Sequence, residues 1–441
     1  MRIGRLSLFA LVFSVACLPI SNQAQNRNDA PHLGRHGDAT QLIVDGKPFL
    51  ILSGELSNNA ATALEPMETI WPKLVAGNLN TVLVGVSWAQ FEPEEGKFNY
   101  SLVDGVIAKA RENHLHIVFL WFGCWKNGTS SYPPYWVKKD FLRFPRIQIG
   151  EGKTVSVSGP VELLSTLSDA TRDADAQAFA ALMRHIKEVD GTQHTVVMMQ
   201  VENEVGVLRD TRDRSPAANR AFAGQVPAEL MNYLQSHKDT LIPEFREVWA
   251  ANGYKKSGTW EEVFGPGKPA TLEIPIQTTV SLLGPLEHEN SWQHLHWASD
   301  EIFMAWNYAR FLEKVAQAGK AAYDIPMYVN AWLQQPNHAW PGTYPSGGPL
   351  RRFMTSGVLA PQTSTSLRPI FTSNTLTISA SASSATAIRS SFPKPVPIPP
   401  MPSWLSANTT PSDSLPSALT ETGPFRRILP PCMAFLISCR P

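Results

Sequence analysis

Residues 196–204 read VVMMQVENE, a short apolar run that ends in acidic and amide side chains. A short run that is apolar at all but one position, Gln200, and is bounded by polar residues is typical of a strand that is buried on both faces. Asn203 and Glu204 would then lie at the carboxyl end of that strand. The stretch therefore predicts a buried parallel strand with a polar site where it ends.

The rest of the first 350 residues repeats this pattern of apolar strands separated by helices. Further strands are predicted at Leu50–Glu55, Asn80–Val86, His116–Phe122 and Pro326–Asn330, and strand-like density also surrounds a turn at Asp45–Pro48. Helices are predicted at Met67–Ala76, Tyr100–Asn113, Ala176–Val189 and over most of 228–320, with a loop-rich stretch at 264–290. Such alternation predicts an α/β fold with a parallel sheet.

The strand ends decide between two kinds of parallel sheet. No G-x-G-x-x-G follows the first strand, which argues against a dinucleotide-binding fold. A (β/α)₈ TIM barrel fits better, because barrel enzymes keep their chemistry at the carboxyl ends of the strands. Only five of the eight strands can be identified in the sequence, so we expect a barrel that is truncated after about five strands.

The amino-acid composition argues against some classes of function. The chain has 38 basic and 38 acidic residues, and no basic run suggests nucleic-acid binding. Its 13 tryptophans suit either sugar stacking or core packing. The four cysteines, Cys17, Cys124, Cys432 and Cys439, show neither a disulfide framework nor zinc spacing.

The N-terminus predicts export. Arg2 and Arg5 precede an apolar run from Leu6 to Leu18, and a small residue at Ala24 offers a cleavage site. This is the pattern of a signal peptide over residues 1–24, and the run is too short to span a membrane comfortably. We expect a bacterial protein that is periplasmic or extracellular. A lipoprotein anchored at Cys17 is an alternative.

Glu204 is the strongest candidate for catalysis. A carboxyl group at a strand end, shielded by aromatic residues, can hold a raised pKa and protonate a leaving oxygen. Asn203 beside it could hydrogen-bond a sugar 2-hydroxyl. Strand alternation points Glu202 the same way as Glu204, as a structural residue or a neighbour that tunes its pKa. A loop-facing polar pair at Asn203 and Glu204 is the alternative interpretation.

A metal centre is not expected. His288, His294 and His296 lie close together in the sequence, but their spacing matches no H-E-x-x-H pattern. A carbohydrate-contacting loop or a helix surface is the preferred interpretation of these histidines, and no cofactor is expected.

Residues 88–98, WAQFEPEEGKF, follow the second predicted strand. With the ENE at 202–204, they make the chain resemble the retaining β-galactosidases of glycoside hydrolase families 35 and 42. Those enzymes carry W-x-x-x-E-P-x-x-G-x-[FY] after the second strand and E-N-E at the end of the fourth. Ser53–Leu56 and Trp121–Gly128 strengthen the match. The resemblance covers residues 40–350 and implies a glycosidase barrel over that range.

The resemblance implies a role for each matching residue. Glu204 matches the acid/base, Asn203 the residue that contacts the 2-hydroxyl, and Glu92 a carboxylate that holds galactose hydroxyls. Five more residues at or just past strand ends are expected to line the pocket: Glu55, Trp125, Asn127, Asn330 and Trp332. For the two tryptophans, packing is an equal alternative. The implied activity is hydrolysis of a terminal β-galactoside or a plant-type oligosaccharide.

The expected nucleophile is missing from the sequence. A retaining mechanism needs a second carboxylate about 5 Å from the first, and the family carries it at strand seven in a segment such as N-P-L-F-I-P-E-T. After Asn330 the only glutamate is Glu421. The tail, residues 351–441, holds 14 of the 36 prolines and 16 serines but two acids, Asp413 and Glu421.

A frameshift near Leu350–Arg352 would explain the tail. When each third codon base is read with the first two bases of the next codon, Ala387–Pro395 permits N-P-L-F-I-P-E-T, with the Glu codon straddling Pro393 and Lys394. As written, the tail should be disordered, the barrel should not close, and the chain should be inactive. Two alternatives are a catalytically dead carbohydrate-binding protein and a same-clan glycosidase for another glycan, such as a β-mannosidase or xylanase.

Overall fold

A computed structural model describes most of the chain before the tail. The described residues are 29–37, 39–150, 153–154, 162–272, 274, 295–330, 332 and 340–350. The expected signal segment with Cys17, the histidines His288 and His294, most of the loop-rich stretch and the whole of 351–441 lie outside the described residues.

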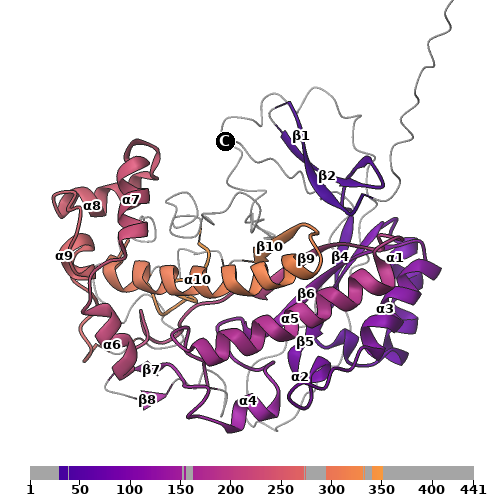
Figure 1. Ribbon diagram of the computed structural model, residues 1–441, viewed down its shortest axis with the longest axis horizontal. Coiled ribbons are helices and arrows are strands. Elements are labelled where there is room, and N and C mark those ends of the chain that lie inside the picture. The colour runs from indigo at the N-terminus through magenta and orange to yellow at the C-terminus, as the bar shows by residue number, and fades with distance from the viewer. Residues whose placement is uncertain are drawn as a thin grey trace, which may run out of the picture.

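The centre of the molecule is a five-stranded parallel sheet in the order β10-β9-β6-β5-β4 (Figure 1). Its strands are β4 (Ser53–Glu55), β5 (Thr81–Ser87), β6 (His116–Lys126), β9 (Val196–Asn203) and β10 (Met327–Asn330). Each strand pairs with the next one along the chain, and all four pairings are parallel. The expected α/β fold is confirmed as a curled half-barrel sheet, consistent with a truncated TIM barrel.

Two smaller sheets accompany the central one. β1 (His32–His36), β2 (Ala39–Val44) and β3 (Lys47–Phe49) form an antiparallel sheet whose β2–β3 turn contains Asp45 and Gly46. β7 (Gln148–Ile149) and β8 (Lys153–Thr154) form a short antiparallel pair. The turn at Asp45–Pro48 was predicted, whereas β1 was not, because its sequence HLGRH has no apolar alternation.

The helices lie between and after the strands. They are α1 (Trp71–Ala76), α2 (Trp88–Phe91), α3 (Ser101–Glu112), α4 (Tyr135–Lys139), α5 (Asp169–Asp190), α6 (Pro216–Phe222), α7 (Ala228–Ser236), α8 (Pro243–Ala251), α9 (Trp260–Phe264) and α10 (Ala298–Ala322). Three 3₁₀ turns are η1 (Ala60–Thr62), η2 (Glu65–Thr69) and η3 (Lys238–Thr240). In the described part of the chain, no helix is both long enough and apolar enough to cross a membrane.

Alternate residues of each strand enter two different cores. On β5, Val82, Val84 and Val86 join the large core, which also contains buried residues of α3, α5 and α10. Leu83, between them, joins a smaller core with Leu42 and Val44 of β2. The period of two follows from strand geometry. One face of the sheet therefore packs on helices, and the other packs on the antiparallel sheet.

The strands are longer or shorter than the apolar runs that predicted them. β6 continues to Lys126, four residues past the run, and ten of its eleven residues are buried. β4 keeps only Ser53–Glu55 of the predicted Leu50–Glu55. Helix α5 begins at Asp169, where the side chain of Ser168 accepts a hydrogen bond from the Thr171 N–H and caps the helix.

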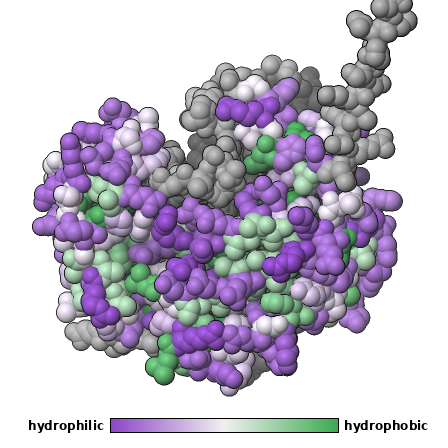
Figure 2. All heavy atoms as spheres, in the orientation of Figure 1, coloured by the Kyte–Doolittle hydropathy of each residue, from purple (hydrophilic) through white to green (hydrophobic). Residues whose placement is uncertain are grey.

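Helices α5 and α10 run side by side across the sheet (Figure 1). The face of the molecule in Figure 2 is mostly hydrophilic, and its hydrophobic residues occur in small groups. Gly319 of α10 lies where a Cβ atom would overlap the Phe179 ring on α5. A glycine is therefore needed at this helix crossing for a packing reason, because helical φ and ψ do not require one.

This close approach predicts the effect of adding one methyl group. Alanine normally stabilises an exposed helix position relative to glycine, but overpacking a core costs about 1–3 kcal/mol. We expect Gly319→Ala to lower the free energy of unfolding by an amount in that range, measured by urea denaturation. Ala321→Val, at an exposed position of the same helix, is the matched control and should change stability by less than about 1 kcal/mol. A higher urea midpoint for Gly319→Ala would contradict the packing argument.

Candidate active site

The site is built where β6 and β9 fall out of register. Trp121 pairs with Val201, yet the next pair along the ladder is Lys126 with Asn203, so β6 contains three more residues than β9 in this interval. Glu202 and Glu204 have left-handed φ angles of 58° and 49°. Left-handed backbone at a residue other than glycine is unfavourable and concentrates at functional sites. The irregularity turns the two glutamates into different surroundings.

Glu204 lies just past β9, half-buried, at the carboxyl edge of the sheet. Its N–H donates to the carbonyl of Asn330 at 3.1 Å, and its own carbonyl accepts from Gly128 N–H at 3.0 Å. Burial raises the pKa of its carboxyl group; the charge of Lys126 lowers that pKa, and the charge of Glu55 raises it further. The balance leaves the pKa above its ordinary value, as a proton donor near neutral pH requires.

Lys126 is a site residue that the sequence interpretation missed. It ends β6, is 6% exposed, and its ammonium lies 4.3 Å from the centre of the Phe122 ring. Burial lowers the pKa of Lys126, and the charges of Glu204 and Glu55 raise it. One buried cation therefore interacts with carboxylates from two strand ends. The available sequence signal was a lysine directly after nine apolar or small residues of a strand.

Asn127, Asn203 and Asn330 form a row of amides across three strand ends. Asn203 Nδ2 donates to Asn127 Oδ1 at 2.8 Å, and Asn330 Nδ2 donates to Asn203 Oδ1 at 2.9 Å. Gln200 Nε2 also donates to Asn203 Oδ1, at 3.0 Å. The Asn127 N–H donates to the Asn203 carbonyl at 3.0 Å. The structure thus brings together three of the predicted site residues beside Glu204.

A polar cavity of about 500 Å³ opens at the same edge of the sheet. Its lining includes Ser87, Gln90, Lys126, Asn127, Thr129 and Tyr132. Among the predicted site residues, Asn127 lines this cavity, and the next residue, Gly128, bonds the Glu204 backbone. Hydroxyl, amide and ammonium groups around a space of this size suit a ligand with many hydroxyl groups.

Glu92 lies below the surface rather than on this lining. It is 5% exposed, its Oε2 accepts from Trp88 Nε1 at 2.7 Å, and its Oε1 accepts from Gly96 N–H at 2.7 Å. Burial raises its pKa, although both hydrogen bonds lower it. These contacts show Glu92 holding the 88–98 segment together; its role in sugar binding stays a prediction.

The remaining predicted residues divide between the edge of the sheet and the core. Glu55 ends β4 with solvent access, although burial in its recess raises the pKa of its carboxyl group. Trp125 is fully buried, donates from Nε1 to the Leu164 carbonyl at 3.1 Å, and packs edge-on against Phe311. Trp332 is partly buried against the large core. For Trp125 the packing alternative describes what the structure shows.

Of the two interpretations of Glu202, the structural one describes what the structure shows, whereas tuning of the Glu204 pKa does not. Glu202 is 1% exposed and accepts from Cys124 N–H at 2.7 Å and Trp125 N–H at 2.8 Å. The groups that shift the pKa of Glu204 are Lys126 and Glu55, and Glu202 is not among them. The left-handed residues at the end of β9 break the period of two, so Glu202 has a structural environment.

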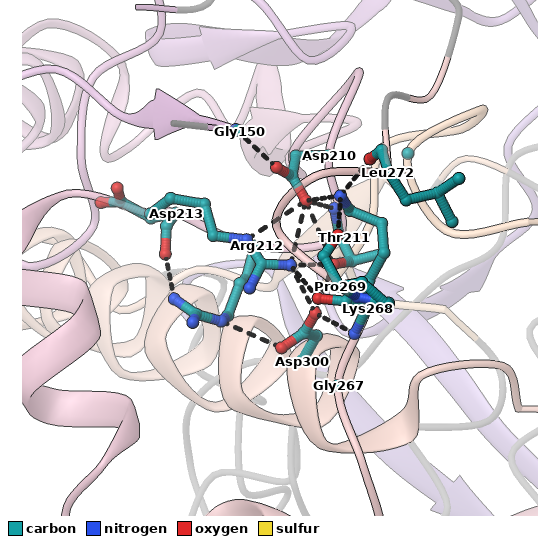
Figure 3. A network of polar contacts seen from close by, with 12 residues as sticks. Gly150, Asp210, Thr211, Arg212, Asp213, Gly267, Lys268, Pro269, Leu272 and Asp300 are labelled. Atoms are coloured by element: carbon teal, nitrogen blue, oxygen red, sulfur yellow. Dashed lines mark hydrogen bonds and ion pairs between the residues drawn. The ribbon is translucent and has the colours of Figure 1, made fainter. Parts of the chain in front are cut away.

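A buried ionic network fixes the chain that follows Glu204 (Figure 3). Asp300 at the start of α10 accepts from Arg212 Nε at 2.9 Å and from Arg214 Nη2 at 2.8 Å. Asp210 lies 3.2 Å from Arg214 and 3.3 Å from Lys268. Burial raises the pKa of Asp210, but these two cations and backbone N–H donors outweigh it and hold the pKa below its ordinary value. Balanced charges of this kind hold a loop in one conformation.

Comparison with known proteins assigns the chain to a family. The family model described as "Beta-galactosidase", glycoside hydrolase family 42, matches residues 65–340, more than half of the chain. The matched region contains the 88–98 segment, Lys126, Asn203 and Glu204. The chain therefore belongs to the family 42 glycoside hydrolases, which confirms the resemblance inferred from the WAQFEPEEGKF and ENE segments.

Individual relatives are more distant. A β-galactosidase of Xanthomonas manihotis is 28% identical over 211 residues, which cover 47% of this chain and 31% of that protein. Beta-galactosidase 11 of Arabidopsis thaliana is 38% identical over 68 residues, 14% of this chain and 8% of that protein. The chain thus spans less than a third of the length of these curated relatives.

Solved structures with a similar fold include the cold-adapted β-galactosidase from Rahnella sp. R3. It is 16% identical, has a TM-score of 0.42, and the match covers 74% of this chain and 39% of that one. The β-galactosidase from Halorubrum lacusprofundi is 17% identical with a TM-score of 0.40, over 74% of this chain and 40% of that one.

The position of Lys126 makes a testable prediction about Glu204. Because the lysine charge favours the ionised carboxylate, Lys126→Met should raise the pKa of Glu204 above its value in the unsubstituted chain. The measurement is a ¹³C NMR titration of glutamate carboxyl carbons, with Glu204→Gln used to assign the signal. Lys97→Met removes an exposed lysine and should leave the pKa of Glu204 where it was. An unchanged or lowered pKa in Lys126→Met would remove Lys126 from the site.

Proposed function

We propose that this chain carries the acid/base half of a retaining β-galactosidase site, with Glu204 as the acid/base. The observation that carries the proposal is a half-buried carboxyl group of raised pKa at the carboxyl end of β9. It adjoins a turn, Asn127–Gly128, whose Asn127 lines a polar cavity. The matching family of β-galactosidases supports a β-galactoside as the substrate, and we propose that the galactose is terminal and that the natural substrate is a β-galactoside or a plant-type oligosaccharide.

In this proposal Glu204 first protonates the glycosidic oxygen of the leaving group. A nucleophilic carboxylate displaces the leaving group and forms the galactosyl-enzyme. Water then attacks the galactosyl-enzyme, and ionised Glu204 takes a proton from that water. Lys126 favours the ionised form and burial favours the protonated form, so the group can change state between the two steps. Asn203, held by Gln200, Asn127 and Asn330, is the proposed partner of the 2-hydroxyl. No cofactor enters this mechanism.

The nucleophile is proposed to come from the coding sequence in a second reading frame. The N-P-L-F-I-P-E-T segment, whose glutamate would be the nucleophile, does not occur in the described residues. The codons for Ala387–Pro395 permit that segment in a shifted reading frame. We propose a lesion near residues 350–352, which leaves the chain as written without turnover. A carbohydrate-binding protein that keeps the cavity and does not hydrolyse is the second candidate, and the polar lining with Lys126 and Asn127 favours it if the tail is genuine.

One experiment separates the candidates. The coding DNA across residues 340–425 is sequenced, and the reading frame is restored if a base is missing or extra. The restored protein should hydrolyse an aryl β-galactoside, and Glu204→Gln should lower kcat by about 10²–10⁴-fold. The chain as written should show no turnover. If the DNA encodes the tail as given and the chain binds galactose without cleaving an aryl galactoside, the binding-protein candidate stands. Turnover by the chain as written would contradict the frameshift.

We also propose export through residues 1–24, on the basis of Arg2, Arg5 and the apolar run up to Leu18. Expression in a bacterium and mass spectrometry of the mature N-terminus tests it. Cleavage near Ala24 supports a secreted or periplasmic protein, and a diacylglyceryl group on Cys17 supports the lipoprotein alternative. An uncleaved Met1 in a fully exported population would overturn both.

A further inference from the structure

We infer that Asp175 and Glu202 share one proton at neutral pH and act as a positioning pair for the end of strand β6. Neither residue is part of the proposed mechanism, and the inference does not depend on the proposed function. Asp175 lies in the second turn of α5, Glu202 is the last residue but one of β9, and they are 0% and 1% exposed.

The two carboxyl groups lie against one another in the core. One oxygen from each, together with the sulfur of Cys124, falls within 4.8 Å of the others. Two ionised carboxylates at this separation, removed from water, would repel strongly. Burial raises the pKa of both, and the charge of Asp175 raises that of Glu202 further, so the pair titrates as a unit that retains a proton.

The hydrogen bonds show where the proton is needed. Both oxygens of Glu202 accept short hydrogen bonds, from Cys124 N–H at 2.7 Å and Trp125 N–H at 2.8 Å. Oδ1 of Asp175 accepts from Trp121 Nε1 at 2.8 Å. Oδ2 of Asp175 is buried and has no donor within the described part of the chain. A carboxylate oxygen buried without a donor is costly, whereas a proton held between the two carboxyl groups lets one of them donate to the other.

The groups that face the pair leave it with one net negative charge. Cys124 is buried beside both carboxyls, and their charges and burial raise the pKa of its thiol, so it is neutral. Burial and the charges of Asp213 and Glu202 raise the pKa of the Tyr308 hydroxyl, so it is neutral as well. Arg146 is the cation whose field reaches Cys124, and Glu92 feels the charge of Asp175. Gly123 provides the room, because a Cβ there would lie 2.5 Å from Glu202 Oε1 and 2.7 Å from Asp175 Oδ1.

Where β6 and β9 lose register, this pair takes the place of the missing ladder hydrogen bonds. The three extra residues of β6 carry the Cys124 and Trp125 N–H groups, and Glu202 accepts both. The next residues are Lys126 and Asn127, which line the polar cavity. The pair therefore fixes the backbone position from which the charge of Lys126 acts on the carboxyl group of Glu204.

A metal ion is the rival occupant of these three side chains. Structural zinc takes four ligands, usually nitrogen and sulfur. Here both oxygens of Glu202 and one of Asp175 already bind N–H donors. These contacts leave one carboxylate oxygen and a neutral thiol, which favours the proton.

Asp175→Asn tests the shared proton in the full chain, because asparagine keeps the shape of the side chain and an acceptor for Trp121 Nε1 but removes one of the two titrating carboxyl groups. In the unsubstituted protein, unfolding releases the shared proton, since free carboxyls are ionised above about pH 5. Its unfolding constant should therefore rise about tenfold more per pH unit, between about pH 6 and 8, than that of Asp175→Asn. Asp173→Asn, at an exposed position of the same helix, should keep the unsubstituted slope.

Two further readouts cover other outcomes. Apart from the band of protonated Glu204, which both proteins keep and Glu204→Gln identifies, the infrared band of a buried protonated carboxyl group should be present in the unsubstituted chain and missing from Asp175→Asn. The pKa of Glu204 should be retained in Asp175→Asn and displaced in Asp175→Ala, because the alanine variant lets the end of β6 move. Equal pH slopes with no carboxyl band would overturn the inference. A stoichiometric metal in the purified chain that is lost in Asp175→Asn would overturn it in favour of a metal site.

Discussion

The loss of register between β6 and β9 is the constraint on which the site depends. Three extra residues on β6 cannot be accommodated by a regular parallel ladder, so two backbone N–H groups need an acceptor from elsewhere. The carboxylate of Glu202 supplies it from within the core. The same irregularity brings Lys126 and Asn127 to the cavity and turns Glu204 away from Glu202. A single break in the hydrogen-bond pattern thereby separates a structural glutamate from a catalytic candidate two residues later.

Buried carboxyl groups are stabilised in different ways at three places in this molecule. At the half-buried edge, Lys126 is the one cation among the described residues whose charge shifts the pKa of Glu204, and burial still raises that pKa. Deeper, the acid pair of Asp175 and Glu202 has no adjacent cation among its hydrogen-bond partners and relies on N–H donors. In the loop after β9, Asp210 and Asp300 are matched by arginines and a lysine, and the pKa of Asp210 falls. The environment of each carboxyl group, rather than its residue type, decides its protonation.

Stability and chemistry occupy opposite parts of the sheet. The helix-side core holds most of the large buried side chains, including Trp71, Trp121 and Trp249, and most of the 13 tryptophans therefore have packing environments or partial burial. The smaller core joins the sheet to β2 through Leu42 and Val44. The amides, Lys126 and Glu204 gather where the strands end. Separation of this kind is characteristic of barrel enzymes, whose strand ends vary while the packed layers hold the fold.

The sequence by itself determined the strands of the central sheet, their order along the chain and the family. Mainly apolar runs at Asn80–Val86, His116–Phe122 and residues 196–201 correspond to β5, β6 and β9, because a strand buried on both faces is nearly continuously hydrophobic. It also identified Asn127, Asn203, Asn330 and Glu204 as neighbours, since parallel strands end at one edge. Only the tertiary structure decided the roles of Lys126, Glu202 and Trp125. Their environments arise from a register shift and from contacts 39 to 78 residues away in sequence, which no local pattern encodes.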